Sequence, residues 1–419
     1  MMKILCSNIN SLPQNVPVGT RAFTFLEASS RPGIGRIASG WLRKLEGAGY
    51  APSIPVWDFM LFCFAVYASD IAVLRKNSAD GWTRQIELDI TLNDPVPWEA
   101  NKAIAEEMLR VLSGDFWTLH FLPGGPTPPK GNHRECDRDC VSLLSGGLDS
   151  LIGGIDATAA GRKPIFVSQL AFEDSARQVA YADALGGGDW HQQWSHKVVF
   201  SGKKETSTRA RSMAFYGLAV LATSLLSVNR AEILIPENGF ISINPPLLPG
   251  RMASLSTRTT HPQFMTFLQK LLDAVGVNAQ LCMPYRFMTK GEMLAQCVDQ
   301  TLLARFACDS TSCGRFRTYN RTHCGRCVPC MVRKAAIQRW GISDTTRYKF
   351  TNLSLAGKAN ADDPMAVACA VLAAEKKGID AFLGATLAFA SAADRPHYRH
   401  VAERGLTELA TLLRRDGII

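Results

Sequence analysis

The chain has 419 residues, enough for about two or three domains. Its composition, 47% hydrophobic and 20% charged, is typical of a soluble globular protein. The first residues lack the apolar core of a signal peptide. The most apolar run, residues 55–67, is too short to cross a bilayer and contains Asp58. We therefore expect a cytoplasmic protein without a membrane partner, in which residues 55–67 form a core helix or strand.

The formal net charge of +9 suits polyanionic partners, from ATP to nucleic acid. A solvated surface is the simpler explanation, because the basic residues are scattered along most of the chain. We therefore do not expect a nucleic-acid partner, although the charge does not exclude one. The one basic patch consists of Arg315, Arg317, Arg321, Arg326, Arg333 and Lys334.

Residues 1–136 are expected to form an α+β N-terminal domain. The alternation in residues 84–92 predicts a strand, the apolar spacing in 98–112 predicts a helix, and residues 116–121 are a further strand candidate. The Pro/Gly-rich segment 123–132 is expected to be a linker. We find no catalytic motif in this part of the chain.

Residues 137–350 alternate between strand and helix patterns, as a doubly wound parallel sheet requires. Ligands bind beyond the carboxyl ends of such strands, so the residues after each strand are candidates for a site. Residues 351–419 are expected to form a helical C-terminal extension, interrupted near Gly378 and Pro396 within 362–413. The strand candidates are 141–144, 164–170, 197–200 and 232–236.

The most informative segment is SGGLDS, which lies between the first strand and a helical run over 151–160. The free N–H groups and positive dipole end of a helix start favour an anion in this loop. The two glycines let the backbone approach that anion, the two serines add hydroxyl donors, and Asp149 can hold Mg²⁺. The alternative is a Gly-rich turn with a serine cap. The candidate binding residues are Ser145, Gly146, Gly147, Leu148, Asp149 and Ser150.

Polar residues also follow the other strands. The backbone of Ser168, Gln169 and Leu170, at the end of the second strand, can bind an adenine edge, and Ser168 is the candidate residue. Arg211 begins the helix after the third strand, and its alternative role is that of a surface arginine. After the fourth strand, Glu237, Asn238 and Gly239 suit hydrogen bonding to a purine-like edge. A simple polar turn would explain the same residues.

Two later segments are also candidates. Arg258 and His261, in the polar loop 256–262 before a helix over 263–275, can bind a carboxylate or phosphate. Lys290 precedes another helix and offers a point charge to phosphates. Thr289 and Glu292, which flank it, also match a capping box, and both interpretations can hold together.

Four cysteines have the spacing C-x10-C-x2-C-x2-C. Two-residue gaps aim successive thiolates at one ion, and four thiolates suit a structural Zn²⁺ without an open coordination position. An iron–sulfur cluster is the main alternative. Cys308 and His323 are expected to be neighbours and not ligands. The expected zinc ligands are Cys313, Cys324, Cys327 and Cys330.

The SGGLDS turn resembles the signature of the PP-loop ATP pyrophosphatases, which cleave ATP between its α and β phosphates. Combined with CGRCVPC at 324–330, it resembles QueC, the 7-cyano-7-deazaguanine synthase family, whose PP-loop domain carries a zinc knuckle. Lys290 falls in a segment similar to the family's TKxE motif. Arg211 falls at an Arg-Asn pair whose Asn is replaced here by Ser212. The resemblance covers 137–350, with the knuckle in 308–334.

This resemblance implies ATP, Mg²⁺ and Zn²⁺ as cofactors. The family adenylates 7-carboxy-7-deazaguanine, and an amine then displaces AMP to give an amide and finally a nitrile. Asp149, Ser150, Lys290 and Arg211 would be catalytic, and Ser168 and Arg211 would contact ATP outside the turn. The implied substrate-binding residues are Glu237, Asn238, Gly239, Arg258 and His261.

Within this family the chain most resembles the enlarged QueC-like proteins of bacterial anti-phage systems, such as QatC of the Qat system. The flanking regions suit docking of a protein encoded in the same operon, whose amine would replace ammonia. Three alternatives remain open. They are a PP-loop sulfur-transfer enzyme acting on tRNA or DNA, a scaffold that binds nucleotide without catalysis, and a simple queuosine-pathway synthase.

Overall fold

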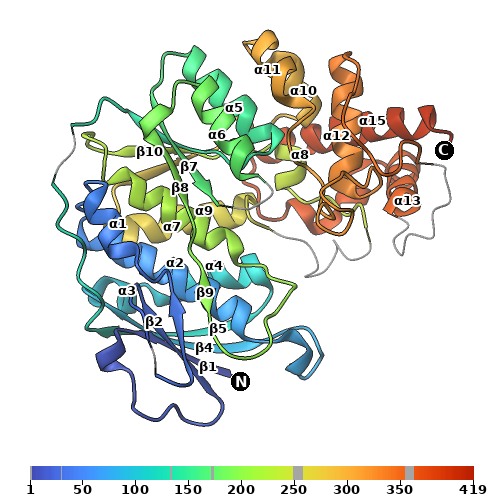
Figure 1. Ribbon diagram of the computed structural model, residues 1–419. Helices are drawn as coiled ribbons and strands as arrows, with labels where there is room; N and C mark the ends of the chain where they lie inside the picture. Colours follow the sequence, from blue (N-terminus) through green and yellow to red (C-terminus); the bar gives the residue numbers. More distant parts are fainter. Residues whose placement is uncertain (1, 30, 133–134, 171–173, 249–257, 354–362) are drawn as a thin grey trace.

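The computed structural model describes residues 2–29, 31–132, 135–170, 174–248, 258–353 and 363–419 (Figure 1). Two sheets organise these residues. The first has the strand order β5-β4-β1-β2-β3-β9, and its neighbours are parallel except for the antiparallel pair β3 and β9. Its strands are β1 (Met2–Ser7), β2 (Thr20–Phe25), β3 (Ile34–Ile37), β4 (Gln85–Leu92), β5 (Phe116–Pro123) and β9 (Val198–Val199).

The N-terminal part is α/β and not α+β, because β1 to β5 are mutually parallel. The strands predicted over 84–92 and 116–121 are confirmed as β4 and β5, whereas the predicted helix over 98–112 is divided at Asn101. Alternation along a strand reports which side chains are buried and carries no information on the direction of its neighbours. The helices between these strands are α1 (Trp41–Gly47), α2 (Ile54–Ala72), α3 (Val96–Ala100) and α4 (Lys102–Ser113).

The second sheet is all parallel, in the order β11-β10-β6-β7-β8. Ile165 and Val167 of β7 belong to the core formed with α7 and α9, whereas Phe166 belongs to the core formed with α5 and α6. Helices therefore cover both faces, and the predicted doubly wound parallel sheet is confirmed. Its elements are β6 (Cys140–Leu143), α5 (Leu148–Ala159), β7 (Pro164–Gln169), α6 (Ser175–Ala184), β8 (His191–Trp194), α7 (Arg211–Thr223), β10 (Ala231–Leu234), α9 (Pro262–Ala274) and β11 (Ala279–Cys282).

The prediction that residues 197–200 form the third strand of this sheet is wrong. Val198 and Val199 pair with Ile37 and Arg36 of β3 and thus belong to the first sheet. The strand beside β7 is β8, which the sequence analysis missed because three of its four residues, His191–Gln193, are polar. At the edge of a sheet such residues pair through their backbone without an apolar face.

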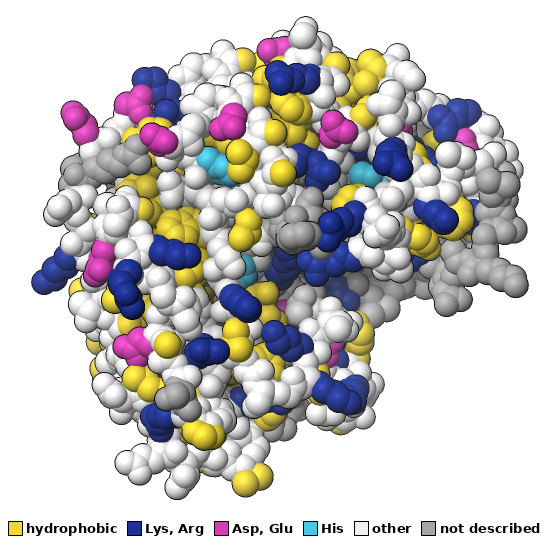
Figure 2. Space-filling model, viewed as in Figure 1, with side chains coloured by type: hydrophobic (Ala, Val, Ile, Leu, Met, Phe, Trp, Pro, Cys, Tyr) yellow, Lys and Arg dark blue, Asp and Glu magenta, His cyan; other side chains and the backbone are white. Residues whose placement is uncertain are grey.

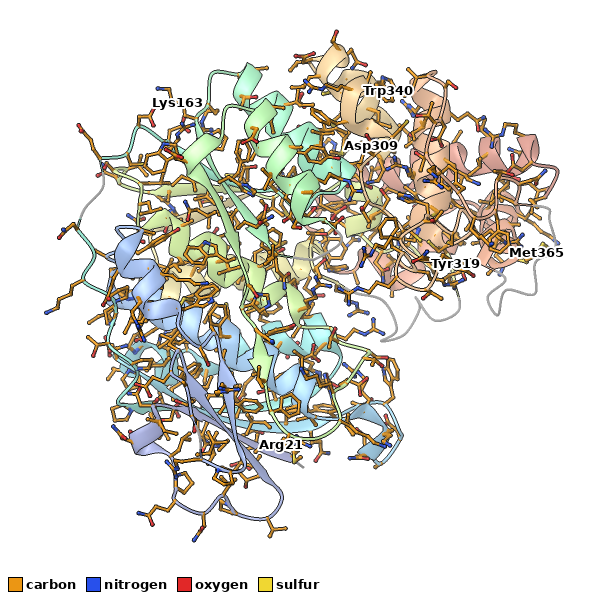
Figure 3. The ribbon with its side chains drawn as sticks, in the orientation of Figure 1. Arg21, Lys163, Asp309, Tyr319, Trp340 and Met365 are labelled. Atoms are coloured by element: carbon orange, nitrogen blue, oxygen red, sulfur yellow. The ribbon has the colours of Figure 1, made fainter. Side chains whose placement is uncertain are left out.

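One core joins the two sheets. It contains residues of β1, β4, α2 and α4 together with residues of α7, α9 and β10. Side chains fill the space between α2 and α4 on one side and α7 and α9 on the other (Figure 3). The helices α2 and α7 pack closely, since a Cβ on Gly217 would lie 2.8 Å from the Cβ of Cys63. The predicted boundary at residue 136 therefore does not separate two hydrophobic cores.

The apolar run at 55–67 is confirmed as a core helix, α2. Among the described helices it is the one whose length and composition would allow it to cross a membrane, and 83% of its most apolar window is buried inside the protein. Phe59, Phe62 and Phe64 are fully buried. Their contacts with the rest of the core explain why this helix is so apolar.

The C-terminal part is helical, as predicted. A second core packs α8, α12 and α15 with α13, and the expected interruptions occur at Gly378, whose φ is +81°, and at Pro396 in the first turn of α15. Residue 362 lies outside the described residues. The helices of the C-terminal part are α13 (Asp363–Lys377), α14 (Ile379–Leu383) and α15 (Arg395–Arg415). The helices that precede them, besides those of the parallel sheet, are α8 (Gly239–Ser242), α10 (Lys290–Gln296), α11 (Gln300–Ala307) and α12 (Val328–Trp340).

Candidate functional site

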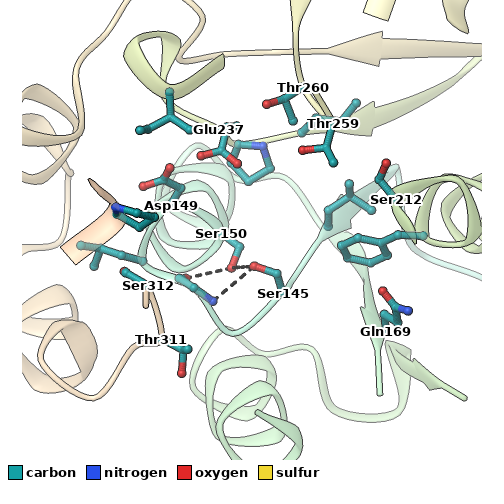
Figure 4. Close-up of a pocket in the computed structure, with 18 of the residues that line it drawn as sticks. Ser145, Asp149, Ser150, Gln169, Ser212, Glu237, Thr259, Thr260, Thr311 and Ser312 are labelled. Carbon is teal, nitrogen blue, oxygen red and sulfur yellow. Dashed lines mark hydrogen bonds between the residues drawn. The ribbon is translucent and has the colours of Figure 1, made fainter. Parts of the chain in front are cut away.

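A pocket of about 600 Å³ lies beyond the carboxyl ends of β6, β7 and β10 (Figure 4). Its size is in the range of small-molecule sites, and its position is where ligands bind in doubly wound sheets. The chain contributes to it from distant segments. Its polar lining includes Ser145, Asp149, Ser150, Gln169, Arg209, Arg211, Ser212, Glu237, Thr259, Thr260, Lys290, Thr311 and Ser312.

Five of the six residues of the SGGLDS turn line this pocket, and the predicted binding residue Gly146 lies outside the lining. Gly146 has a φ of +87°, which an L side chain adopts only with strain. The Ser145 hydroxyl donates to Ser150 Oγ at 3.1 Å and accepts from the N–H of Gly147 at 3.2 Å, and the Ser150 hydroxyl donates to the Gly147 carbonyl at 2.9 Å. The helix after the turn begins at Leu148, three residues earlier than predicted. Its first turn therefore lines the pocket.

Asp149 is the electrostatic centre of the site. It forms an ion pair with Lys290 and accepts a hydrogen bond from Asn238 Nδ2 at 2.7 Å. Burial disfavours the charged form of Asp149, but Lys290, Glu237 and Asn238 hold its pKa below its usual range. Burial and the neighbouring Asp149 raise the pKa of Glu237 well above its usual range. Of the two carboxyl groups, Asp149 is therefore the one whose charged form the site stabilises.

The start of α10 places Lys290. Thr289 caps this helix by accepting from the Glu292 N–H at 3.1 Å, and the Glu292 carboxylate accepts from the Thr289 N–H at 2.9 Å. This confirms the capping box predicted from the sequence. The same turn directs Lys290 to Asp149 at the pocket, and the role of Lys290 toward phosphates stays a prediction.

Several predicted site residues lie outside the pocket lining. The hydroxyl of Ser168 is fully buried and donates to the Leu144 carbonyl at 2.6 Å, while its neighbour Gln169 lines the pocket instead. A Cβ on Gly239 would lie 2.0 Å from the Arg286 carbonyl, so this glycine serves close packing. Asn238 caps α8 and holds Asp149, behind the pocket surface.

Arg258 and His261 are also absent from the pocket lining. Arg258 donates to the Val111 carbonyl at 3.5 Å. His261 caps α9 through Nδ1, packs against Phe389, and has its pKa lowered to about 4 by burial and by Arg258. Residues 256 and 257 of this loop lie outside the described residues, and Thr259 and Thr260 are the residues of the segment that line the pocket.

The sequence analysis missed several lining residues. Phe215 and Tyr216 of α7 line the pocket. Thr311 and Ser312 lie on the side of the pocket away from Gln169 (Figure 4). The Thr311 N–H donates to the Gly146 carbonyl at 3.2 Å and thus ties the knuckle region to the turn. No local pattern marks these residues, because they line the pocket through long-range packing.

The four predicted cysteine ligands converge. Their sulfur atoms all lie within 4.8 Å of one another, and two of the pairs are 3.9 Å apart. Zn–S bonds of about 2.3 Å at tetrahedral angles place sulfurs about 3.8 Å apart, so the cluster is consistent with Zn²⁺ binding. Backbone N–H groups of residues 315, 324, 326 and 327 donate to these sulfurs at 3.2–3.4 Å and stabilise thiolates.

The turn of this knuckle depends on Gly325. Its φ is +83°, and a Cβ there would lie 2.1 Å from the Phe350 carbonyl. Cys308 and His323 lie outside the four-sulfur cluster, as predicted. His323 Nε2 instead accepts from the Ser312 N–H at 3.2 Å, next to the pocket. The knuckle thus supports one wall of the site.

The fold and these features define an α/β protein with two sheets, one of them all parallel, and a buried four-cysteine cluster consistent with Zn²⁺ binding. No family model, curated protein or solved structure matches the chain.

Proposed function

We propose that the protein uses ATP to activate a carboxylate and then transfers the acyl group to an amine, as the resemblance to the QueC family implies. The observation that carries the proposal is the SGGLDS turn, which presents the first turn of a 12-residue helix to the pocket. Helix N-termini with adjacent hydroxyls bind phosphate oxygens. The acid that the resemblance implies is 7-carboxy-7-deazaguanine.

The donor set fits ATP with Mg²⁺. Asp149 offers carboxylate oxygens, the ligands that Mg²⁺ prefers, and Lys290 and Arg211 offer positive charge to phosphates. When bound, Mg²⁺ would neutralise charge on the phosphate oxygens. Without Mg²⁺, the ion pair with Lys290 balances the charge of Asp149.

The proposed reaction has two steps. A carboxylate oxygen of the acid attacks the α phosphorus, the bond from that phosphorus to the bridging oxygen breaks, and pyrophosphate leaves. The amine nitrogen then attacks the acyl carbon, AMP leaves with the former carboxylate oxygen, and the nitrogen loses a proton. Conversion of the resulting amide to a nitrile would consume a second ATP.

In this scheme the residues of the chain act by position and charge. Ser145, Ser150 and the α5 N-terminus would hold the pyrophosphate oxygens, and Lys290 would oppose the charge that develops on them. Glu237 would hydrogen bond to the purine-like edge of the acid and orient it.

The lining of the pocket favours this ligase over a sulfur-transfer enzyme. A persulfide mechanism needs a reactive cysteine at the site, and none of the described residues that line the pocket is a cysteine. The four knuckle cysteines are engaged with one another. The amine acceptor is ammonia or an amine of a partner protein, and this partner, the role in anti-phage defence and the cytoplasmic location rest on the resemblance and the sequence.

The test is incubation of the purified protein with ATP, Mg²⁺ and 7-carboxy-7-deazaguanine, with and without ammonium, and measurement of AMP and pyrophosphate. We expect acid-dependent release of both, reduced about 100-fold or more by Asp149→Asn. Asp183→Asn, on the exposed side of α6, is the matched control and should retain activity. Absence of AMP from the wild-type reaction, or equal activity of the two variants, would contradict the proposal.

A further inference from the structure

Arg209 is a pocket residue that the proposed mechanism does not use. It lies in the loop before α7 and lines the pocket, yet its side chain is only 6% exposed. Figure 2 shows Lys and Arg side chains gathered around the hollow near the middle of this face. Arg211, two residues along the chain, is exposed at the same pocket. A buried guanidinium is rare unless it is paired.

The guanidinium of Arg209 has no hydrogen bond or ion pair with the described residues, and its Nε is an unsatisfied buried donor. It lies over the ring of Trp82, 5.4 Å from the centroid. Burial and the nearby Arg75 lower its pKa to about 10, which leaves it charged at neutral pH. A buried charge without a partner destabilises the protein until a counter-ion arrives.

The nearest acidic groups are already neutralised by other arginines. The carboxylate of Asp115 accepts hydrogen bonds from Nη1 and Nη2 of Arg75, at 2.9 and 3.0 Å. Arg84 forms ion pairs with both Asp115 and Asp70. All four side chains of this network are at most 3% exposed. The network therefore cannot serve as the counter-ion of Arg209.

The same network fixes the loop that carries Arg209. The second carboxylate oxygen of Asp70 accepts from the N–H groups of Arg209 and Ala210, each at 2.7 Å. Asp70 lies in α2, 139 residues earlier in the chain. The N-terminal part thus holds the loop in place before any ligand binds, with a guanidinium at the pocket that has no partner in the described part of the chain.

We propose that Arg209 binds an oxyanion of the ligand: a phosphate group of the nucleotide or the carboxylate of the acid. This inference rests on the proposed function for the identity of the two sources. The ligand oxyanion supplies the charge partner that the described residues do not, and the planar guanidinium can hold two of its oxygens.

The test compares Arg209→Met with Arg84→Met, which removes a buried but paired arginine. If Arg209 awaits a ligand, Arg209→Met should keep or raise the melting temperature of the ligand-free protein. Arg84→Met should lower it by several degrees, because it leaves the buried Asp70 without its arginine partner and Asp115 with Arg75 alone. A large loss of stability in Arg209→Met would show a structural role and overturn the inference.

Calorimetric titration identifies the source of the oxyanion. We expect Arg209→Met to lower the affinity either for pyrophosphate and ATP or for the carboxylated deazaguanine, by about 10-fold or more. Adenosine and 7-deazaguanine, which lack these groups, should bind as they do to the wild type. Unchanged affinity for all three anions overturns the inference, and so does a wild type that binds none of them.

The inference and the proposed function can fail separately. Pyrophosphate binding that depends on Arg209, without acid-dependent AMP release, would contradict the proposed function alone. AMP release with unchanged anion affinity in Arg209→Met would contradict this inference alone.

Discussion

Burial sets the protonation state of His196, which contacts the pocket residue Gln169. His196 is 6% exposed, accepts from the Gln169 side-chain amide at 2.8 Å, and packs against Phe64 and Tyr67. Burial and the positive charge of Arg211 lower its pKa to about 3. The folded protein therefore holds His196 neutral, in the form that accepts the hydrogen bond from Gln169.

This predicts an acid-sensitive stability. Between pH 6.5 and about 3 the unfolded chain protonates this histidine and the folded protein does not, so stability falls by about 1.4 kcal/mol per pH unit on acidification. His196→Gln should remove this part of the slope. The measurement is denaturant unfolding at pH 7.5, 6.0 and 5.0.

The exposed His400 provides the control. His400→Gln should leave the dependence on pH as it is in the wild type. If the stability of His196→Gln falls as steeply with acidification as that of the wild type, His196 is not held neutral.

At the scale of elements, the locally encoded features were predicted well. The turn after β6, the capping box before α10 and the helix break at Gly378 each follow from a few adjacent residues, and each occurs as predicted. The assignment of strands to sheets was less successful. Val198–Val199 was correctly predicted as a strand but assigned to the wrong sheet. Its partner is decided by the position of β3, which the local sequence does not encode.

The cysteine knuckle carries a prediction of its own. The purified protein should contain one zinc ion per chain, and Cys330→Ser should weaken zinc binding more than about 100-fold, because loss of an outer-shell partner alone costs 10–100-fold. Metal analysis and thermal unfolding measure both effects. Iron with visible absorbance would instead show a cluster.

The exposed Cys369 is the matched control for this experiment. It lies in α13, outside the four-sulfur cluster, so Cys369→Ser should keep both the zinc and the melting temperature. Equal zinc contents in Cys369→Ser and Cys330→Ser would contradict the assignment of the knuckle.

At the scale of the whole molecule, the two sheets depend on each other. The helix α2 lies between the N-terminal sheet and α7, and its aromatic side chains belong to the shared core (Figure 1). Asp70 at the end of this helix also holds the Arg209 loop. The N-terminal part therefore supports a loop of the pocket, although none of its described residues lines it.

Residues 1–136 and residues 137–419 should consequently fail to fold when each is produced without the other. Each large apolar side chain that α2 buries contributes about 1.5–3 kcal/mol, and exposing several exceeds the 5–15 kcal/mol that stabilises a whole domain. We expect residues 137–419 to be insoluble when expressed alone and soluble when co-expressed with residues 1–136. A monodisperse fragment 137–419 would contradict this prediction.

The sequence by itself determined the features that depend on neighbouring residues: the SGGLDS turn, the spacing of the cysteines, the cap at Thr289 and the burial pattern of α2. Each arises from backbone conformation or from periodicity over a few residues. Only the tertiary structure decided that Lys290 neutralises Asp149, that Gln169 and not Ser168 lines the pocket, and that Arg209 is buried without a partner among the described residues. These depend on which surfaces meet, and that is set by packing between segments far apart in the chain.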